Sequence, residues 1–333
     1  MKIAIVKLSA LGDIVHAMVA LQFVKQANTD IKIDWLVEQR FAGVLQDNPD
    51  INQILPVNLK KLKENKSHLI TEIKKVNNFA KNNYDMVIDA QGLIKSSVTS
   101  RILSANTVGF DKSSIREKLA SLLYKKTVNF PYDGNTIDRN IAVITEPLKI
   151  QVTKKQVFNK KPFLFYKDWD SQLERFFVKD KANIVFVMGS TWPSRNYPKE
   201  KYLSVLQGLN ANGLIIWGNE QEKQTAEWIE ARTDNATILP KLDFNNLKAV
   251  LALSDLVIGN DTGPTHMAWG LNKPSITLFG PTPVSRVYQT EINKVIKSPS
   301  IVNPYKLNKN DFSIKEIQES DIIELAQVLL TSK

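Results

Sequence analysis

The residues with the clearest chemical potential lie in the segment Gly259–Gly270, GNDTGPTHMAWG. An apolar run ends at Ile258, so we expect a buried strand, a turn, and a helix that starts near Pro264, because proline suits a first helical turn. Thr262 and Gly263 would then leave backbone N–H groups at the helix start. The helix dipole places positive charge there, so such a terminus binds anions and especially phosphate.

His266 falls in the first turn of the same helix, where its ring could donate to a phosphate oxygen. The alternative is an ordinary capped helix in which Asp261 or Thr262 satisfies the N–H groups of the first turn. A second apolar run with a Gly-Pro-Thr turn follows at 273–282. Two such turns at the ends of neighbouring strands favour a binding site over simple capping.

Polar residues also follow the first strands expected in the second half of the chain. The segment GSTWPSRNYPKEKY offers the Thr191 hydroxyl and the Arg195 cation, whose planar fork suits phosphate. A polar loop with a surface arginine is the alternative. Glu222, after the next strand, could accept hydrogen bonds from ribose hydroxyls. It could equally be an acid that the helix dipole favours at a helix start.

The turn after the first expected strand, VKLSALGDIVHA, holds a second candidate centre. Asp13 is either a helix N-cap or a general base at the mouth of a cleft. Lys7 comes just before this turn and is either an anion contact or a solvated strand end.

Basic residues elsewhere in the first half could attract an acidic ligand. The run NLKKLKENK, 58–66, follows a strand, and a run of this kind is usually a solvated face. If it faces a cleft, its lysines would bind an acidic acceptor together with two later arginines; the candidates are Lys60, Lys61, Lys63, Arg116 and Arg139.

The hydrophobic pattern predicts the elements that must position these side chains. Stretches of helical spacing alternate with apolar runs typical of buried strands, among them 2–8, 32–38, 84–92, 183–189 and 214–218. A charged stretch near 149–163 interrupts the alternation, which then resumes. We therefore expect an α/β protein with two doubly wound parallel sheets in tandem, the domains being 1–153 and 154–333.

Composition limits the function classes. The chain has 333 residues, of which 43% are hydrophobic, and its net charge is +10, which favours anionic partners. It has no cysteine, so cysteine-ligated zinc is excluded and a reducing cytoplasm is expected. The N-terminal residues do not read as a signal peptide, and no segment approaches the roughly 20 apolar residues of a membrane-spanning helix.

Several cofactor motifs are missing from the sequence. Neither G-x-G-x-x-G nor G-x-x-x-x-G-K-[ST] occurs, which disfavours a nicotinamide or flavin enzyme and a P-loop nucleotidase. No cluster of histidine and carboxylate in the sequence indicates a divalent metal. We therefore expect neither a metal nor a cofactor. A nucleic-acid partner would rest on charge alone, because no nucleic-acid-binding motif is present.

Six segments resemble, in order and spacing, the bacterial lipopolysaccharide heptosyltransferases, a family of GT-B glycosyltransferases: IVKLSALGDIVHAMVAL, IDWLVEQRFA, DAQGLIKS, GSTWPSRNYPKEKY, WGNEQE and NDTGPTHMAWGLNKPSITLFGPT. The resemblance covers nearly the whole chain. It implies the GT-B fold, in which two Rossmann-like domains face a central cleft. The N-terminal domain would bind the acceptor and the C-terminal domain, with its final helix, the nucleotide sugar.

The resemblance also implies a reaction. L-glycero-D-manno-heptose would pass from ADP-heptose to Kdo of Kdo–lipid A by a single inverting displacement, because DAQGLIKS and DWLVEQ are most like the members that add the first heptose. Such an enzyme would be a cytoplasmic monomer that attaches peripherally to the inner membrane. Addition of a later core heptose and non-catalytic binding of a nucleotide sugar are the alternatives.

The matching positions carry the family's roles. Asp13 would be the general base, and a lysine of the family is replaced here by Arg195. With the candidates above, the expected donor site comprises Thr191, Arg195, Glu222, Leu242 (near the adenine), Asp261, Thr262, Gly263 and His266. The expected acceptor site comprises Lys7, Lys60, Lys61, Lys63, Arg116 and Arg139.

Overall fold

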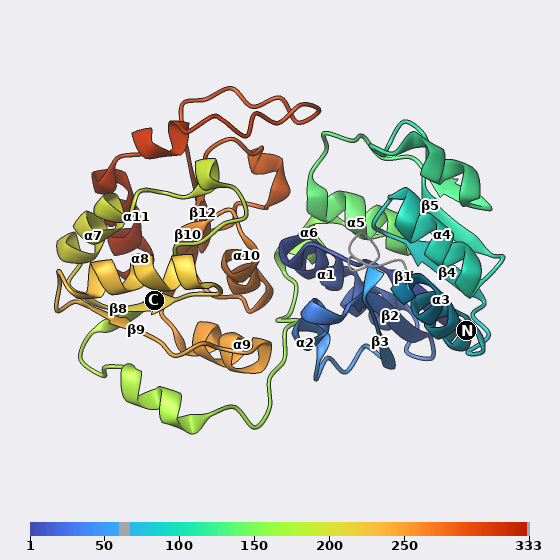
Figure 1. The fold of residues 1–333 in the computed structure, drawn as a ribbon, viewed down its shortest axis with the longest axis horizontal. Coiled ribbons are helices and arrows are strands. Elements are labelled where there is room, and N and C mark those ends of the chain that lie inside the picture. The colour runs from blue at the N-terminus through green and yellow to red at the C-terminus, as the bar shows by residue number, and fades with distance from the viewer. Residues whose placement is uncertain (60–66, 332–333) are drawn as a thin grey trace. The chain divides into compact units, whose positions relative to one another are not determined.

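A computed structural model describes residues 1–59 and 67–331. The chain divides into two compact units, Met1–Phe165 and Tyr166–Lys333 (Figure 1). Each unit contains a parallel sheet with helices packed against it. The expected α/β class with two doubly wound sheets is confirmed.

The N-terminal unit is built on a six-stranded sheet of order β3-β2-β1-β4-β5-β6. Its strands are β1 (Lys2–Val6), β2 (Lys32–Glu38), β3 (Gln53–Val57), β4 (Met86–Asp89), β5 (Thr107–Phe110) and β6 (Lys126–Val128). The strand order reverses between β1 and β4, so the loops that follow these two strands lie side by side at the carboxyl edge.

Helices connect these strands. They are α1 (Leu11–Ala27), α2 (Ala42–Leu45), α3 (Ser67–Ala80), α4 (Ile94–Leu103), α5 (Thr136–Thr145) and α6 (Lys154–Phe158), with shorter 3₁₀ turns η1 (Gln39–Phe41), η3 (Lys118–Leu123) and η4 (Glu146–Leu148). Helix α1 is buried continuously from Ile14 to Val24 because it packs on the sheet and against α5. It therefore holds its first turn firmly at the end of β1.

The C-terminal unit repeats this architecture with the strand order β12-β11-β10-β7-β8-β9. Its strands are β7 (Ala182–Val187), β8 (Ala211–Ile216), β9 (Ala236–Ile238), β10 (Leu256–Asn260), β11 (Ser275–Phe279) and β12 (Asn293–Lys297). Its helices are α7 (Lys199–Gly208), α8 (Glu220–Glu230), α9 (Phe244–Leu253), α10 (Gly263–Gly270) and α11 (Glu319–Thr331), with 3₁₀ turns η5 (Ser171–Phe176), η6 (Pro193–Arg195), η7 (Val284–Arg286) and η8 (Ser313–Glu316). The order reverses between β7 and β10.

The charged stretch near 149–163 is structured. Thr153 and Gln156 form a reciprocal capping box at the start of α6. Beyond this helix, the Asn48 amide donates to the Phe163 carbonyl at 3.0 Å. These contacts join the stretch to the N-terminal unit, so the division of the chain falls after Phe165 and not after residue 153.

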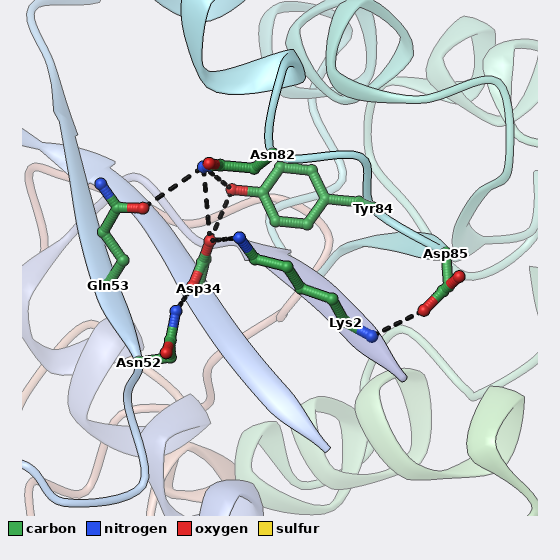
Figure 2. Close-up of polar contacts among 7 residues, drawn as sticks. All are labelled: Lys2, Asp34, Asn52, Gln53, Asn82, Tyr84 and Asp85. Carbon is green, nitrogen blue, oxygen red and sulfur yellow. Dashed lines mark hydrogen bonds and ion pairs between the residues drawn. The ribbon is translucent and has the colours of Figure 1, made fainter. Parts of the chain in front are cut away.

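A polar network lies at the amino-terminal edge of the first sheet, away from the loops that follow its strands (Figure 2). The Asp34 carboxylate on β2 is fully buried and accepts from the Tyr84 hydroxyl and the Asn52 amide, each at 2.7 Å. The Lys2 ammonium lies 3.3 Å from the same carboxylate. Because these residues lie near the amino ends of β1 and β2, they stabilise the sheet on the side away from the strand-end loops.

One further property concerns membranes. Among the helices of residues 1–59 and 67–331, none combines the length and the apolar character needed to cross a bilayer.

Candidate active site

The loops after β7, β10 and β11 bring a cluster of charges together at the carboxyl edge of the second sheet. Asp261, which directly follows β10, is 1% exposed. One carboxylate oxygen accepts from the Thr282 hydroxyl at 2.6 Å and lies 2.9 Å from Arg195 Nη2. Arg286 Nε approaches this same oxygen to 4.0 Å, and the other oxygen lies 2.9 Å from His266 Nε2. One acid therefore orients two arginines and a histidine.

The charge state of Asp261 follows from these partners. Burial alone would raise the pKa of its carboxyl, but Arg195, the hydrogen bond from His266 and Arg286 together lower that pKa well below the usual range. An ionised carboxylate can only accept, so His266 Nε2 must carry the hydrogen that it shares with Asp261. Asp261 thus acts as a fixed acceptor that positions its neighbours.

Helix α10 begins beside this cluster. Thr262 is its N-cap residue and makes no side-chain capping hydrogen bond, and Pro264 stands in the first turn. Asp261 does not cap the helix either, since its side chain faces Arg195, His266 and Thr282. The simple capping alternative therefore does not describe this turn. The positive end of the helix and the neighbouring arginines can together hold an anion such as a diphosphate.

A pocket of about 250 Å³ lies next to this region, between the loop after β7 and the start of α8. Its walls include Ser190 and Asn196, whose buried side-chain oxygens have no hydrogen-bond partner among the described residues. A bound ligand could supply those partners. The pocket is therefore suited to a polar molecule.

Glu222 forms another wall of the pocket. Its carboxylate accepts from the Gly218 amide and from the Asn219 side chain, each at 2.7 Å, so it also has the helix-start role that the sequence left open. A side chain at Gly189 would overlap the Glu222 carboxyl, so Glu222 would have to shift to make room for it. Glu222 is thus held in place at the pocket and faces the end of β7.

The other expected donor residues are distributed around the same edge. Arg195 Nη1 donates to the exposed Thr191 hydroxyl at 3.4 Å, which gives the guanidinium a second anchor. Leu242 is half-buried between β9 and α9 and does not line the pocket. Arg286 and Asn196 were not among the candidates from the sequence. The sequence feature that could have indicated Arg286 is its position shortly after the buried strand β11.

The N-terminal unit carries the second candidate centre, at the end of β1. Asp13 is half-buried in the first turn of α1, and its Oδ2 accepts from the Ala10 amide at 3.1 Å. Its Oδ1 makes no hydrogen bond to the part of the chain that the structure describes. One oxygen of Asp13 therefore stabilises the helix start while the other can serve as a base.

Lys7 is buried, so it is not the solvated strand end that the sequence left as an alternative. Its side chain lies against the loop that follows β4. It is 7% exposed, and its ammonium donates to the Ala90 carbonyl at 2.7 Å. Burial lowers the pKa of Lys7, while the charges of Asp13 and Asp89 oppose this shift. The Lys7 amine is thus a buried basic neighbour of Asp13 at the strand ends.

The loop after β4 is rigid. Asp89 is fully buried and accepts from the Ser96 and Tyr124 hydroxyls at 2.7 Å. The Gln91 side chain in turn accepts from the Leu8 and Ser9 amides at 2.9 and 3.0 Å. The β4 loop therefore fixes the loop that leads to Asp13.

The remaining basic candidates differ in their surroundings. The Arg139 guanidinium donates to the carbonyls of Phe130, Pro131 and Ser114, so it joins segments within the unit. The Arg116 side chain is 73% exposed and open to a ligand. Three candidates, Lys60, Lys61 and Lys63, lie outside the described residues. In the ranges that are described, no group of three or more histidine, aspartate or glutamate side chains could hold a metal ion.

Two doubly wound α/β units in tandem are the architecture of the GT-B fold. Comparison with solved structures agrees. The Escherichia coli heptosyltransferase WaaC with ADP-2-deoxy-2-fluoro heptose matches with a TM-score of 0.79 at 24% identity, over 98% of this chain and 99% of that one.

Sequence comparison supplies the family. Residues 74–314 match glycosyltransferase family 9 (heptosyltransferase). Lipopolysaccharide heptosyltransferase 1 of Campylobacter coli is 37% identical over 349 aligned residues, which cover 99% of both chains. Its counterpart in Escherichia coli (strain K12) is 28% identical over 296 residues, covering 85% of this chain and 88% of that one. The chain belongs to glycosyltransferase family 9 and is a glycosyltransferase, which confirms the resemblance drawn from its motifs.

Proposed function

We propose that this enzyme transfers L-glycero-D-manno-heptose from ADP-heptose to Kdo of Kdo–lipid A, with inversion at the anomeric carbon and without a metal. The observation that carries the proposal is the anion site at α10, where Asp261 holds Arg195, Arg286 and His266. Membership of family 9 supports heptose as the sugar. The relatives named lipopolysaccharide heptosyltransferase 1 and the solved relative with an ADP-heptose analogue support the two substrates.

The donor side supplies electrostatic stabilisation. As the bond between the anomeric carbon and the diphosphate breaks, ADP leaves with the electron pair and its negative charge grows. Arg195 and the N–H groups at the start of α10 would meet this charge, and they would stabilise the transition state more than the ground state. Glu222 would accept from the ribose hydroxyls at the adjoining pocket.

The acceptor side supplies the base. Asp13 Oδ1 would take the proton of the Kdo hydroxyl as the hydroxyl oxygen bonds to the anomeric carbon on the face opposite ADP. A single displacement of this kind inverts the anomeric centre. Lys7, Arg116 and the lysines of the 58–66 run would attract the acidic acceptor.

We place the enzyme at the cytoplasmic face of the inner membrane as a peripheral protein. The proposed acceptor is a lipid, and the net charge of +10 favours an anionic membrane surface.

One assay tests the reaction. The protein is incubated with ADP-heptose and Kdo–lipid A, with and without EDTA, and the products are read by mass spectrometry. We expect one heptose to be added, ADP to be released, and EDTA to have no effect. Intact ADP-heptose would contradict transfer, and reaction only with an acceptor that already carries heptose would indicate a later step.

The first prediction concerns the base. Asp13→Asn keeps an oxygen for the Ala10 amide but cannot take a proton, so the fold and ADP affinity should persist while the rate of transfer falls by about 10²–10⁴-fold. Circular dichroism, ADP titration and the transfer assay measure these quantities. The matched control is Asp170→Asn, which also removes a carboxylate that accepts a backbone amide, at the start of η5. Equal rates for wild type and Asp13→Asn would refute the assignment.

A further inference from the structure

Three neighbouring elements of the N-terminal unit expose large apolar side chains. Helix α4 contacts both α3 and η3, and Figure 1 shows α3 and α4 side by side. Leu119 and Leu122 on η3 are 66% and 75% exposed. We call the whole set the apolar patch; it comprises Leu69, Ile70, Ile73, Ile94, Val98, Leu119 and Leu122.

The spacing of the patch residues aligns them on each element. Ile94 and Val98 are four residues apart on an α-helix, and Leu119 and Leu122 are three apart on a 3₁₀ turn. Both spacings return a side chain to the same face. The same elements bury other apolar residues inward, such as Val76 and Ala120. Each element therefore has a second, outward apolar face, which packing within the unit does not explain.

Such a surface is unfavourable in water. Each square ångström of exposed apolar area forgoes about 25 cal/mol that burial would provide. Single exposed apolar residues are common, but contiguous groups mark binding surfaces. The patch therefore indicates a binding partner with an apolar interior.

The charges around the patch identify the kind of partner. Six basic residues lie on the three elements or up to two residues before them: Lys74, Lys75, Lys95, Arg101, Arg116 and Lys118. Two of them lie near an acid, because Lys95 is 3.1 Å from Glu38 and Arg116 is 3.8 Å from Glu117. The two acids in the same segments are used internally, because Glu72 is buried and accepts the Asn58 amide and Glu117 accepts the Ile94 amide. An apolar surface surrounded by cations matches an anionic bilayer, which offers hydrocarbon beneath negative headgroups.

The patch also adjoins the proposed acceptor side. Helix α4 begins directly after the β4 loop, in which Gln91 accepts the Leu8 and Ser9 amides and Ala90 accepts the Lys7 ammonium. Through these hydrogen bonds, the start of α4 is joined to the loop that carries Asp13. A membrane bound at the patch would thus lie near the site where a lipid-linked sugar must enter.

We propose that the apolar patch inserts into the surface of an anionic bilayer, with the surrounding lysines and arginines on the lipid headgroups. The proposal rests on the proposed function, because it presents the N-terminal unit to a lipid-linked acceptor. The bilayer itself is the partner, so binding requires neither ADP-heptose nor Kdo–lipid A.

The test uses the full-length protein and vesicles of phosphatidylcholine, with or without phosphatidylglycerol. We expect wild type to co-sediment with the vesicles that contain phosphatidylglycerol and much less with phosphatidylcholine alone. The variant Leu119→Ser/Leu122→Ser should bind the anionic vesicles at least about tenfold more weakly, because each buried leucine contributes substantially to transfer from water. The matched control is Ile301→Ser, which replaces an apolar residue that is 97% exposed in the C-terminal unit.

Several results would overturn the proposal. These are no binding by wild type, an equal loss in Ile301→Ser, or a wild-type dimer that the double variant converts to a monomer. Transfer is measured separately with Kdo–lipid A dispersed in detergent, where the double variant should match wild type. Vesicle binding without transfer would refute the proposed function alone, and transfer in detergent without vesicle binding would refute the patch alone. Circular dichroism verifies that the variants fold.

Discussion

At the scale of single residues, the most consequential group of the C-terminal unit is the Asp261 carboxylate, whose partners in the structure are other side chains. It fixes Arg195 and His266, and Thr282 orients it in turn. A guanidinium can bind Asp261 and Thr191 through different nitrogens and still present N–H groups to a phosphate, which a single ammonium does less precisely.

We predict that Asp261→Asn loses both stability and ADP affinity. The amide is neutral, so the buried Arg195 charge loses its counter-ion, and breaking a buried pair typically costs about 3–5 kcal/mol. Denaturant unfolding and calorimetric ADP titration measure the two effects. Asp311→Asn is the control: its carboxylate also has a lowered pKa, through Ser300 and Ser313, but it lies outside the donor site. An Asp261→Asn variant that binds ADP as tightly as wild type would contradict this positioning role.

A second residue-scale prediction concerns Lys160, which is buried and whose ammonium lies 5.3 Å from the Phe163 ring. Burial lowers its pKa to about 7, whereas the unfolded chain keeps the proton to about pH 10.4. Unfolding therefore takes up a proton in this window, and stability rises with pH by at most about 1.4 kcal/mol per unit. Lys160→Met removes the titration, so its gain over wild type should be largest near pH 7 and shrink toward about pH 10.

Denaturant unfolding of both proteins across this pH range provides the measurement. The neighbouring Lys161 is exposed, so Lys161→Met is the matched control for the loss of a lysine. A constant difference for Lys160→Met would show that the folded protein does not depress the pKa of this amine.

At the scale of elements, the strands that apolar runs predict are those buried on both faces, such as β1, β7 and β10. Two of the four edge strands, β6 and β12, escaped prediction for a physical reason. β6 has three residues, two of them exposed, and β12 reads NKVIK, so neither carries a continuous apolar run. Helix α6 was not predicted, because the Thr153–Gln156 capping box lies in a lysine-rich stretch that has the composition of a linker.

The residues of the candidate site likewise fall into those that the sequence could predict and those that it could not. Residues that follow directly on a buried strand, such as Asp261, or that begin a helix, such as Asp13, could be found by position. Arg286 could not be assigned to Asp261, because that pairing depends on the register of β10 against β11. The burial of Lys7 likewise depends on the β4 loop, which lies more than eighty residues away in the chain.

At the scale of the whole molecule, the proposed chemistry is divided between two units that each have their own sheet and hydrophobic core. The proposed base lies in Met1–Phe165, and every described residue of the proposed donor site lies in Tyr166–Lys333. Affinity for the nucleotide and competence for proton transfer should therefore respond to different substitutions.

This division leads to the last prediction. A ligand stabilises the folded state to which it binds, by about 2.7 kcal/mol at a hundredfold excess over its Kd. ADP should therefore slow hydrogen exchange of the core amides in β7, β10 and β11, which exchange only when their unit unfolds, and leave those of β1 and β2 unchanged. Mass spectrometry of peptides from each strand measures this, and Asp13→Asn should give the same pattern as wild type. Equal protection of β1 and β2 would mean that the donor site is not confined to the C-terminal unit or that the two units unfold as one.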